Sequence, residues 1–248
     1  MLQFIPSGKL DSLTIRCFAG SMKAQLAIYD MDRTVTRRAT YMPFLLHAAR
    51  RLAPWRLLLL PAAGVVTLAY FLRLIDRARL KELNYTLLVG RGVAPDRLEP
   101  VVASFAEATL RGNVLPGALR AIEADRAAGR RLVLATASYE LYAAAIGRRL
   151  GFDDVIATRT GVDAHGRIVA RIDGSNCYGL AKRDMVEAWL QQQGLARDAL
   201  HVRFYSDHHS DAPMHRYADE AVAANANARL TRLARAEGWE VVTWRERR

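Results

Sequence analysis

The sequence is poor in cysteine and lacks a long clean apolar segment. Its 248 residues include only two cysteines, Cys17 and Cys177, whereas disulfide-stabilised secreted domains use more. We therefore expect a reducing compartment and free thiols. The uncharged run Leu57–Leu72 has 16 residues and is interrupted by Pro61 and Gly64. Because a membrane-spanning helix needs about 20 apolar residues, we expect a buried or interfacial helix pair there rather than a span.

Acidic residues are also scarce in one region, since none occurs between Thr34 and Asp76. The net charge is +11, and residues 37–113 account for +7 of it, with 12 basic and 5 acidic side chains. Such an excess is compatible with an anionic partner, either phosphate or a membrane surface. An arginine-rich composition with solvated helix faces would give the same numbers. A nucleic-acid partner is unlikely, because the basic patches are not interleaved with aromatic residues and no nucleic-acid motif is present.

The ends of the predicted elements indicate an α/β fold. Residues 1–22 are mixed in character and form no convincing secretory signal, so we treat them as a leader of unknown role. An apolar run, Gln25–Tyr29, predicts a buried parallel strand that ends at Asp30. Residues 41–111 then repeat apolar positions every three or four residues, which predicts helices. From residue 117 onward, strand and helix patterns alternate, with strands at 131–135, 155–172, 201–205, 221–224 and 239–243 and helices at 118–128, 139–150, 179–193 and 226–237.

Alternating strands and helices predict a parallel sheet covered by helices on both faces. Functional residues of such sheets lie beyond the carboxyl ends of the strands. Three predicted strands end in chemistry-bearing residues, namely Asp30, Thr136 and Asp207. We therefore expect these three residues to share one edge of the sheet.

The first polar group is Asp30-Met31-Asp32-Arg33-Thr34. Two carboxylates separated by one residue in a loop that leaves a strand can serve as nucleophile and proton donor. A pair of solvated turn aspartates would look the same, but the buried strand before them favours the functional interpretation. At Thr136-Ala137-Ser138, a hydroxyl followed by backbone N–H groups at a helix start can hold phosphate oxygens. An ordinary helix cap is the alternative.

Two further groups follow in the second half of the chain. Lys182, near a helix start, could neutralise phosphoryl charge, although a single lysine is more often a surface residue. The segment Ser206-Asp207-His208-His209-Ser210-Asp211 offers oxygen ligands suited to Mg²⁺. Zinc is improbable there, because adjacent histidines point in different directions and no further ligand lies at useful spacing.

Taken in order, these groups resemble the four motifs of the haloacid dehalogenase-like (HAD) superfamily. The segments Thr136-Ala137-Ser138, Asn176-Cys177-Tyr178-Gly179 and Tyr205-Ser206-Asp207 resemble those of subfamily IB. The resemblance covers about residues 24–244. It implies a HAD-like Rossmannoid core made of residues 23–36 and 114–248, with an inserted α-helical C1 cap at 37–113. It also implies a phosphatase that passes the phosphoryl group through an aspartyl-phosphate, with Mg²⁺ as cofactor and a phosphate monoester as substrate.

The resemblance also implies a role for each residue. Asp30 would be the nucleophile and Asp32 the acid and base. Thr136, Ala137 and Lys182 would bind phosphate. Mg²⁺ would be held by Asp30, by Asp207 and by the backbone carbonyl of Asp32, while Thr34 and Asp211 would support the site. Arg33 departs from the Gly or Asp of many relatives and could touch phosphate or face solvent.

The substrate is less defined. Phosphoserine phosphatases of this family carry a glutamate nine residues after the nucleophile, matched to the substrate ammonium, and this chain has Ala39 there. Phosphoserine is therefore disfavoured. The apolar run and the arginines beside it resemble the cap of phosphatidylglycerophosphate phosphatases and suit an anionic lipid interface. A cap helix packed on its neighbours would give the same pattern.

Two function classes remain open. One is a phosphomonoesterase acting on a small soluble or a lipid-borne phosphate. The other is a catalytically silent membrane- or partner-binding protein on the same fold. We expect a cytoplasmic protein, in contact with the inner face of a membrane if the cap meets lipid. The sequence is silent on the oligomeric state.

Overall fold

The computed structural model describes residues 23–245, so the leader predicted at 1–22, with Cys17, lies outside the described residues. One seven-stranded sheet runs in the order β4-β3-β2-β1-β5-β6-β7. All neighbouring strands pair in parallel except β3 and β4, which form an antiparallel hairpin at one edge. The strands are β1 (Ala24–Tyr29), β2 (Arg131–Tyr139), β3 (Asp154–Val162), β4 (Ile168–Asp173), β5 (Leu200–Ser206), β6 (Glu220–Ala224) and β7 (Glu240–Val242).

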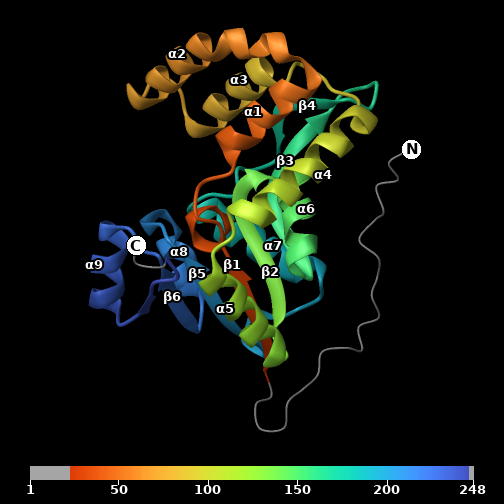
Figure 1. The fold of residues 1–248 in the computed structure, drawn as a ribbon. Helices are drawn as coiled ribbons and strands as arrows, with labels where there is room; N and C mark the ends of the chain where they lie inside the picture. The colour runs from red at the N-terminus through yellow and green to blue at the C-terminus, as the bar shows by residue number, and fades with distance from the viewer. Residues whose placement is uncertain (1–22, 246–248) are drawn as a thin grey trace.

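Strand β1 is central because its side chains are apolar on both faces. Leu26 and Ile28 pack on one side with Val186 of helix α7, whereas Ala27 and Tyr29 pack on the other with Ile122 of helix α5. This alternation is the period of two expected of a strand covered on both faces. Figure 1 shows the sheet between these helices. The α/β class with helices on both faces is confirmed.

The helices after the first strand fall into two groups along the chain. The core helices are α5 (Pro116–Ala127), α6 (Glu140–Leu150), α7 (Leu180–Gln192), α8 (Ala212–Tyr217) and α9 (Ala228–Glu237), with short turns η3 (Arg197–Ala199) and η4 (His209–Asp211). The inserted helices are α1 (Tyr41–Leu52), η2 (Pro54–Leu59), α2 (Leu60–Phe71), α3 (Arg77–Leu88) and α4 (Pro95–Gly112). The helical pattern predicted for 41–111 is therefore confirmed, while the division into a core and a cap at 37–113 stays a proposal.

The inserted helices touch the sheet at its antiparallel edge. Val93 forms an antiparallel bridge with Ile168 of β4, through Val93 N to Ile168 O at 2.9 Å and Ile168 N to Val93 O at 2.9 Å. Glu82 of α3 accepts a hydrogen bond from Ile172 N at 3.0 Å. The insert is thus pinned to the β3–β4 hairpin and is held at this edge.

The apolar run at 57–72 differs from its prediction. The 3₁₀ helix η2 continues directly into α2, so Pro54–Phe71 forms 18 consecutive helical residues with a mean hydropathy of 1.4. Only 6% of them are buried, and this is the one candidate membrane-spanning helix among residues 23–245. Pro61 does not break it because proline is tolerated in the first turn of a helix. The buried alternative is therefore wrong, because the run forms one largely exposed apolar helix, while the interfacial alternative stays a prediction.

The second strand is longer than predicted. It continues past residue 135 to Tyr139, and its register against β3 shifts between Thr136 and Tyr139. The irregularity lets Thr136, Ala137 and Ser138 leave the regular ladder. Helix α6 then starts at Glu140 rather than at 139.

Candidate active site

The carboxyl ends of β1, β2 and β5 meet at one edge of the sheet, as the sequence predicted. β1 lies between β2 and β5, and Asp30, which follows it, donates its backbone N–H to Tyr205 O at 2.9 Å. Thr136 lies near the end of β2 and Asp207 directly follows β5. Parallel pairing therefore brings residues 30, 136 and 207 to the same edge.

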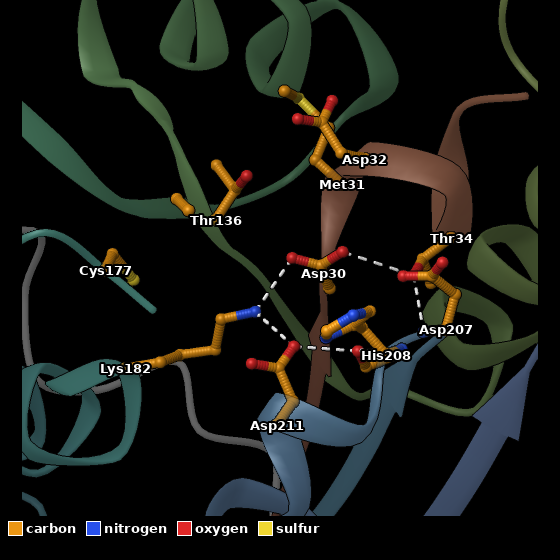
Figure 2. Close-up of polar contacts among 12 residues, drawn as sticks. Asp30, Met31, Asp32, Thr34, Thr136, Cys177, Lys182, Asp207, His208 and Asp211 are labelled. Carbon is orange, nitrogen blue, oxygen red and sulfur yellow. Dashed lines mark hydrogen bonds and ion pairs between the residues drawn. The ribbon is translucent and has the colours of Figure 1, made fainter. Parts of the chain in front are cut away.

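A buried ionic cluster occupies this edge. Lys182 Nζ lies 2.8 Å from Asp30 Oδ1 and 2.7 Å from Asp211 Oδ2, and the Lys182 residue is 1% exposed. Lys182 comes from the first turn of α7, which follows Gly179 at φ 60°, a left-handed conformation that favours glycine. Figure 2 shows the lysine reaching from α7 between the two carboxylates. The surface-lysine alternative is wrong for Lys182.

Thr34 and Ser206 hold the carboxylates in place. The Thr34 hydroxyl donates to Asp30 Oδ2 at 3.2 Å and accepts from Asp207 N at 3.0 Å (Figure 2). The Ser206 hydroxyl donates to Asp211 Oδ2 at 2.7 Å. Asp211 Oδ1 is buried and has no hydrogen-bond partner among the described residues. Thr34 and Asp211 therefore belong to the cluster geometrically, as expected of supporting residues.

Asp32 lies apart from this cluster. Its Oδ1 accepts from Thr40 N at 2.9 Å and from the Thr40 hydroxyl at 2.7 Å, and its Oδ2 accepts from the Ser138 hydroxyl at 3.0 Å. Figure 2 shows the Asp32 carboxylate away from Lys182 and Asp211. Arg33, which follows Asp32 in the same turn, has φ 65°, and its side chain is exposed. Two carboxylates from one short loop thus have different surroundings, as different chemical roles require.

The second predicted phosphate-binding segment is partly engaged elsewhere. The Thr136 hydroxyl accepts from Ser138 N at 3.1 Å within β2. The N-cap of α6 is Tyr139, which makes no side-chain cap, so the helix-cap alternative is wrong for Thr136 and Ser138. The Ala137 carbonyl accepts from Lys81 Nζ at 2.6 Å and from the Thr158 hydroxyl at 3.0 Å. These two hydrogen bonds fix the backbone near the end of β2. The Thr136 hydroxyl remains on the site side of that segment, near the Asp30 group in Figure 2.

Burial and charge act together on the titration of the cluster. Burial raises the pKa of Asp30 to about 6, against the lowering effect of Lys182, and neighbouring carboxylates add to the rise. Burial also raises the pKa of Asp207 to about 7, helped by repulsion from Asp30 and Asp211. Burial alone would lower the pKa of Lys182, but Asp211 and Asp30 raise it above its ordinary value. The lysine is therefore charged at neutral pH, and the carboxylates carry more negative charge than it balances.

This donor set fits a hard divalent cation. Apart from the Lys182 ammonium, the groups that contact Asp30 or follow the neighbouring strand offer oxygen ligands, and Mg²⁺ takes one or two carboxylates while keeping several waters. Within residues 23–245, no three His, Cys, Asp or Glu side chains are already gathered as a metal site. The predicted set needs only two such side chains, Asp30 and Asp207, together with the Asp32 carbonyl. The excess negative charge at this edge is what a cation would offset.

Several residues at the site were missed from the sequence. Thr40 and Ser138 bind the Asp32 carboxylate, and Asn225 donates to the carbonyls of Arg33 and Thr34 at 3.2 Å each. Lys81, from α3, is the buried amine behind residue 137. Thr40 and Ser138 are common helix-start residues, so the sequence offered only a capping signal for them. Nothing local distinguishes Lys81 from the other basic residues of the insert.

Comparison with known proteins places the chain in a family. Residues 27–216 match the family described as haloacid dehalogenase-like hydrolase. Protein CicA of Caulobacter vibrioides is 30% identical over 196 residues, which cover 79% of this chain and 83% of CicA. Phosphoserine phosphatase SerB1 of Mycobacterium tuberculosis is 37% identical over 119 residues. That match covers 48% of this chain but only 37% of SerB1.

Solved structures agree on the fold. A protein of unknown function from Bordetella pertussis Tohama I has a TM-score of 0.81 and 25% identity, and the match covers 90% of this chain and 100% of that one. A phospho-aspartyl intermediate analogue of phosphoserine phosphatase has a TM-score of 0.60 at 16% identity, covering 90% and 95%. At that identity the second likeness shows the fold alone. The matched domain, the motif order and the sheet-edge geometry agree, and the chain belongs to the haloacid dehalogenase-like hydrolase family.

Proposed function

We propose that this chain is a phosphomonoester hydrolase in which Asp30 attacks phosphorus and Asp32 handles the proton. The observation that supports it most is the Asp30–Lys182–Asp211 cluster at the sheet edge, with a carboxylate held 2.8 Å from a buried ammonium. A carboxylate nucleophile approaches an anionic phosphoryl group only where positive charge offsets the repulsion. Membership of the haloacid dehalogenase-like hydrolase family is compatible with this covalent route.

Each residue of the site has a distinct part in this mechanism. Lys182 neutralises phosphoryl oxygens, and the Thr136 hydroxyl and the Ala137 N–H hold them in position. Asp32 protonates the leaving oxygen and then takes a proton from the water that hydrolyses the aspartyl-phosphate. Thr40 and Ser138 hold the Asp32 carboxylate away from Asp30 before substrate arrives. The separation keeps the nucleophile and the acid from sharing one proton.

Mg²⁺ would be held by the Asp30 and Asp207 side chains and by the Asp32 backbone carbonyl, with Asp211 supporting the shell. When bound it would withdraw charge from the phosphoryl group and orient it for in-line attack. Thr34 positions both metal-binding carboxyl residues, because its hydroxyl bonds Asp30 on one side and Asp207 N on the other.

For the substrate we propose a small or lipid-borne phosphate monoester other than phosphoserine. Position 39 is alanine, between Arg38 and Thr40, so the counter-charge for a substrate ammonium is missing at that position. SerB1 is described as a phosphoserine phosphatase, but the chain matches little more than a third of it. A cytoplasmic location, with peripheral contact to anionic lipid, stays a prediction.

Phosphate release by the purified protein tests the proposal. We expect Mg²⁺-dependent turnover of some members of a panel of amino-acid, sugar, nucleotide and vesicle-borne lipid phosphates. Asp30→Asn should lower kcat by about 10³-fold or more, because the nucleophile is removed. Asp163→Asn, which changes a half-buried aspartate in the turn between β3 and β4, is the matched control. Equal activity in Asp30→Asn and the wild type would contradict the proposal.

A further inference from the structure

An exposed apolar surface covers the outer side of the inserted helices. It consists of the side chains of η2, α2 and the turn after them that remain open to solvent, and we call it the α2 face. Leu58 is 80% exposed, Phe71 73% and Leu74 73%. The other large members are Trp55, Leu60, Val65, Leu68 and Leu72. Soluble proteins rarely leave so many large apolar side chains together in water, so the α2 face is a candidate binding surface.

The α2 face is the outermost layer of the molecule. Figure 1 shows α2 lying over α3, on the side away from the sheet. Helix α3 turns its other side toward the core, where Lys81 and Tyr85 are buried. The α2 face is therefore not a core surface that a small shift of the helix would bury. It can meet a flat partner without disturbing the sheet edge.

The charge around the α2 face identifies the chemistry of that partner. No acidic residue occurs between Thr34 and Asp76. At one end of the helix, Arg50 and Arg51 are exposed on the last turn of α1, and at the other end Arg73 and Arg77 are exposed. Apolar side chains between cationic ends are typical of helices that lie in the interface of an anionic bilayer.

A cationic pocket adjoins the same helix. It has a volume of about 500 Å³ and is lined by Arg56, Arg91 and Arg167 together with Leu59 of η2. Arg56 stacks on Trp55 with its guanidinium carbon 4.8 Å from the ring centroid. An aromatic ring with an arginine stacked on it is typical of the headgroup region of a bilayer, because the ring can contact acyl chains while the guanidinium stays in water. The arginines of the pocket add positive charge beside η2, although Arg167 is paired with Asp163 at 2.8 Å.

The geometry excludes a span across the bilayer. Six 3₁₀ and twelve α-helical residues together reach roughly 30 Å, about the hydrocarbon thickness of a bilayer, so length alone would permit one. However, Arg56 Nη1 near the start of the helix donates to Thr86 O and Leu87 O at the end of α3, at 3.1 and 2.9 Å. After Phe71 the chain turns back into α3 at Asp76. Both ends of the continuous η2–α2 helix are thus held on α3, and α3 is bonded to the core through Lys81.

We propose that the α2 face docks in the plane of an anionic lipid bilayer, with its apolar side chains in the interface and its arginines at the headgroups. The proposal concerns binding and does not depend on catalysis. An anionic lipid surface is favoured over a second copy of this chain, because two copies would bring arginine-rich ends together.

Vesicle binding of the full chain tests the proposal. We expect cosedimentation with vesicles of phosphatidylcholine containing phosphatidylglycerol, at least tenfold weaker binding to phosphatidylcholine alone, and weakening with salt. The variant Leu58→Glu/Phe71→Glu should lose binding to the anionic vesicles by tenfold or more. Leu119→Glu changes an exposed leucine of α5 instead and should bind like the wild type. Circular dichroism and thermal melting of each variant show whether it is folded.

Trp55 gives a second, local measurement. Its emission should shift to the blue and be quenched by brominated lipid when vesicles are added, and Trp55→Phe should remove most of that change. Failure of the folded wild type to bind anionic vesicles would overturn the proposal, and so would equal binding by the double glutamate variant. A dimer in sedimentation equilibrium that the double variant dissolves, without vesicle binding, would assign the α2 face to self-association instead.

Discussion

Lys182 is the residue on which the charge balance of the site depends. Its amine is the donor shared by Asp30 and Asp211, and all three groups are buried. Removing one member of a buried ionic group leaves the remaining charges uncompensated, which costs more than the group contributes intact. The Lys182 ammonium therefore contributes to the stability of the folded protein and, in the proposed mechanism, to phosphate binding.

Replacement of Lys182 by methionine should show both effects. We expect a loss of roughly 10²- to 10³-fold in kcat/KM, because a preorganised cationic donor is lost. At pH 8 the free energy of unfolding should fall by about 3–5 kcal/mol, measured by urea denaturation. Lys182→Arg keeps the charge with a different geometry, so it should recover stability more than activity. Unchanged stability in Lys182→Met would contradict the assigned role.

Asp32 is the other informative residue, because its carboxylate accepts hydrogen bonds from Thr40 and Ser138 and, within residues 23–245, is not paired with a lysine or arginine. Asp32→Asn keeps the size of the side chain but removes the proton donor and acceptor. We expect kcat to fall by about 10²- to 10⁴-fold, with a smaller loss for substrates whose leaving group needs no proton, such as p-nitrophenyl phosphate. A loss of equal size for good and poor leaving groups would argue against proton transfer by Asp32.

Among the elements, α3 links the inserted helices to the site. Lys81 donates to Ala137 O at 2.6 Å and to Asn176 Oδ1 at 2.9 Å, and its amine lies 4.7 Å from the centroid of the Tyr139 ring. These contacts join the inserted helix to the end of β2 and to the loop that leads into α7. Burial, followed by repulsion from Arg77, lowers the pKa of Lys81 to about 7.

The depressed pKa of Lys81 gives stability a defined pH dependence. Below pH 7 the Lys81 amine is charged in both the folded and the unfolded state. The desolvation of the buried charge then lowers the free energy of unfolding by its full amount. Between pH 7 and about 10.4 the unfolded chain holds more protons at Lys81 than the folded one, so the free energy of unfolding rises with pH. From pH 6.5 to 9.5 the wild type should gain about 3 kcal/mol relative to Lys81→Met.

Urea denaturation at both pH values measures this difference. Lys23→Met, which removes an exposed amine before β1, is the control and should track the wild type. If Lys81→Met and the wild type change in parallel between the two pH values, the pKa of Lys81 is not lowered in the folded protein.

At the scale of the whole molecule, the sheet collects residues that are far apart in the sequence. Asp30 and Lys182 are 152 positions apart, and Thr34 and Asp207 are 173 apart, yet both pairs are in hydrogen-bond contact. Folding thus concentrates negative charge at one edge. A cation that binds there only in the folded state should stabilise the entire chain.

Addition and removal of Mg²⁺ should reveal this linkage. At about 100 times its dissociation constant, one Mg²⁺ should raise the free energy of unfolding by about 2.7 kcal/mol, and a chelator should reverse the effect. Asp207→Asn should lose most of the gain, whereas Asp163→Asn in the exposed β3–β4 turn should keep it. Equal gains in the two variants, measured by thermal unfolding, would place the cation elsewhere.

Most of the fold could be read along the chain, because its signals are local. Apolar runs that end in Asp30 and Asp207, and the glycines that close α6 and α9, mark strands and helices whatever surrounds them. Parallel strands bring their carboxyl ends to one edge, so the approach of Asp30 and Asp207 followed from the order of the strands. The place of Lys182, on helix α7, was implied only by the family resemblance. The extension of β2 to Tyr139 could not be read, because a bulge depends on the neighbouring strand.

The sequence by itself determined the class of fold, the order of the motifs and the chemical types gathered at the sheet edge. Only the tertiary structure decided that Thr40 and Ser138 bind Asp32, that Lys81 is buried while most other basic residues of the insert are exposed, and that the apolar helix η2–α2 faces outward. The physical reason is that periodicity and residue type are properties of neighbours in the chain. Burial and hydrogen-bond partners depend on surfaces that meet only after the chain has folded.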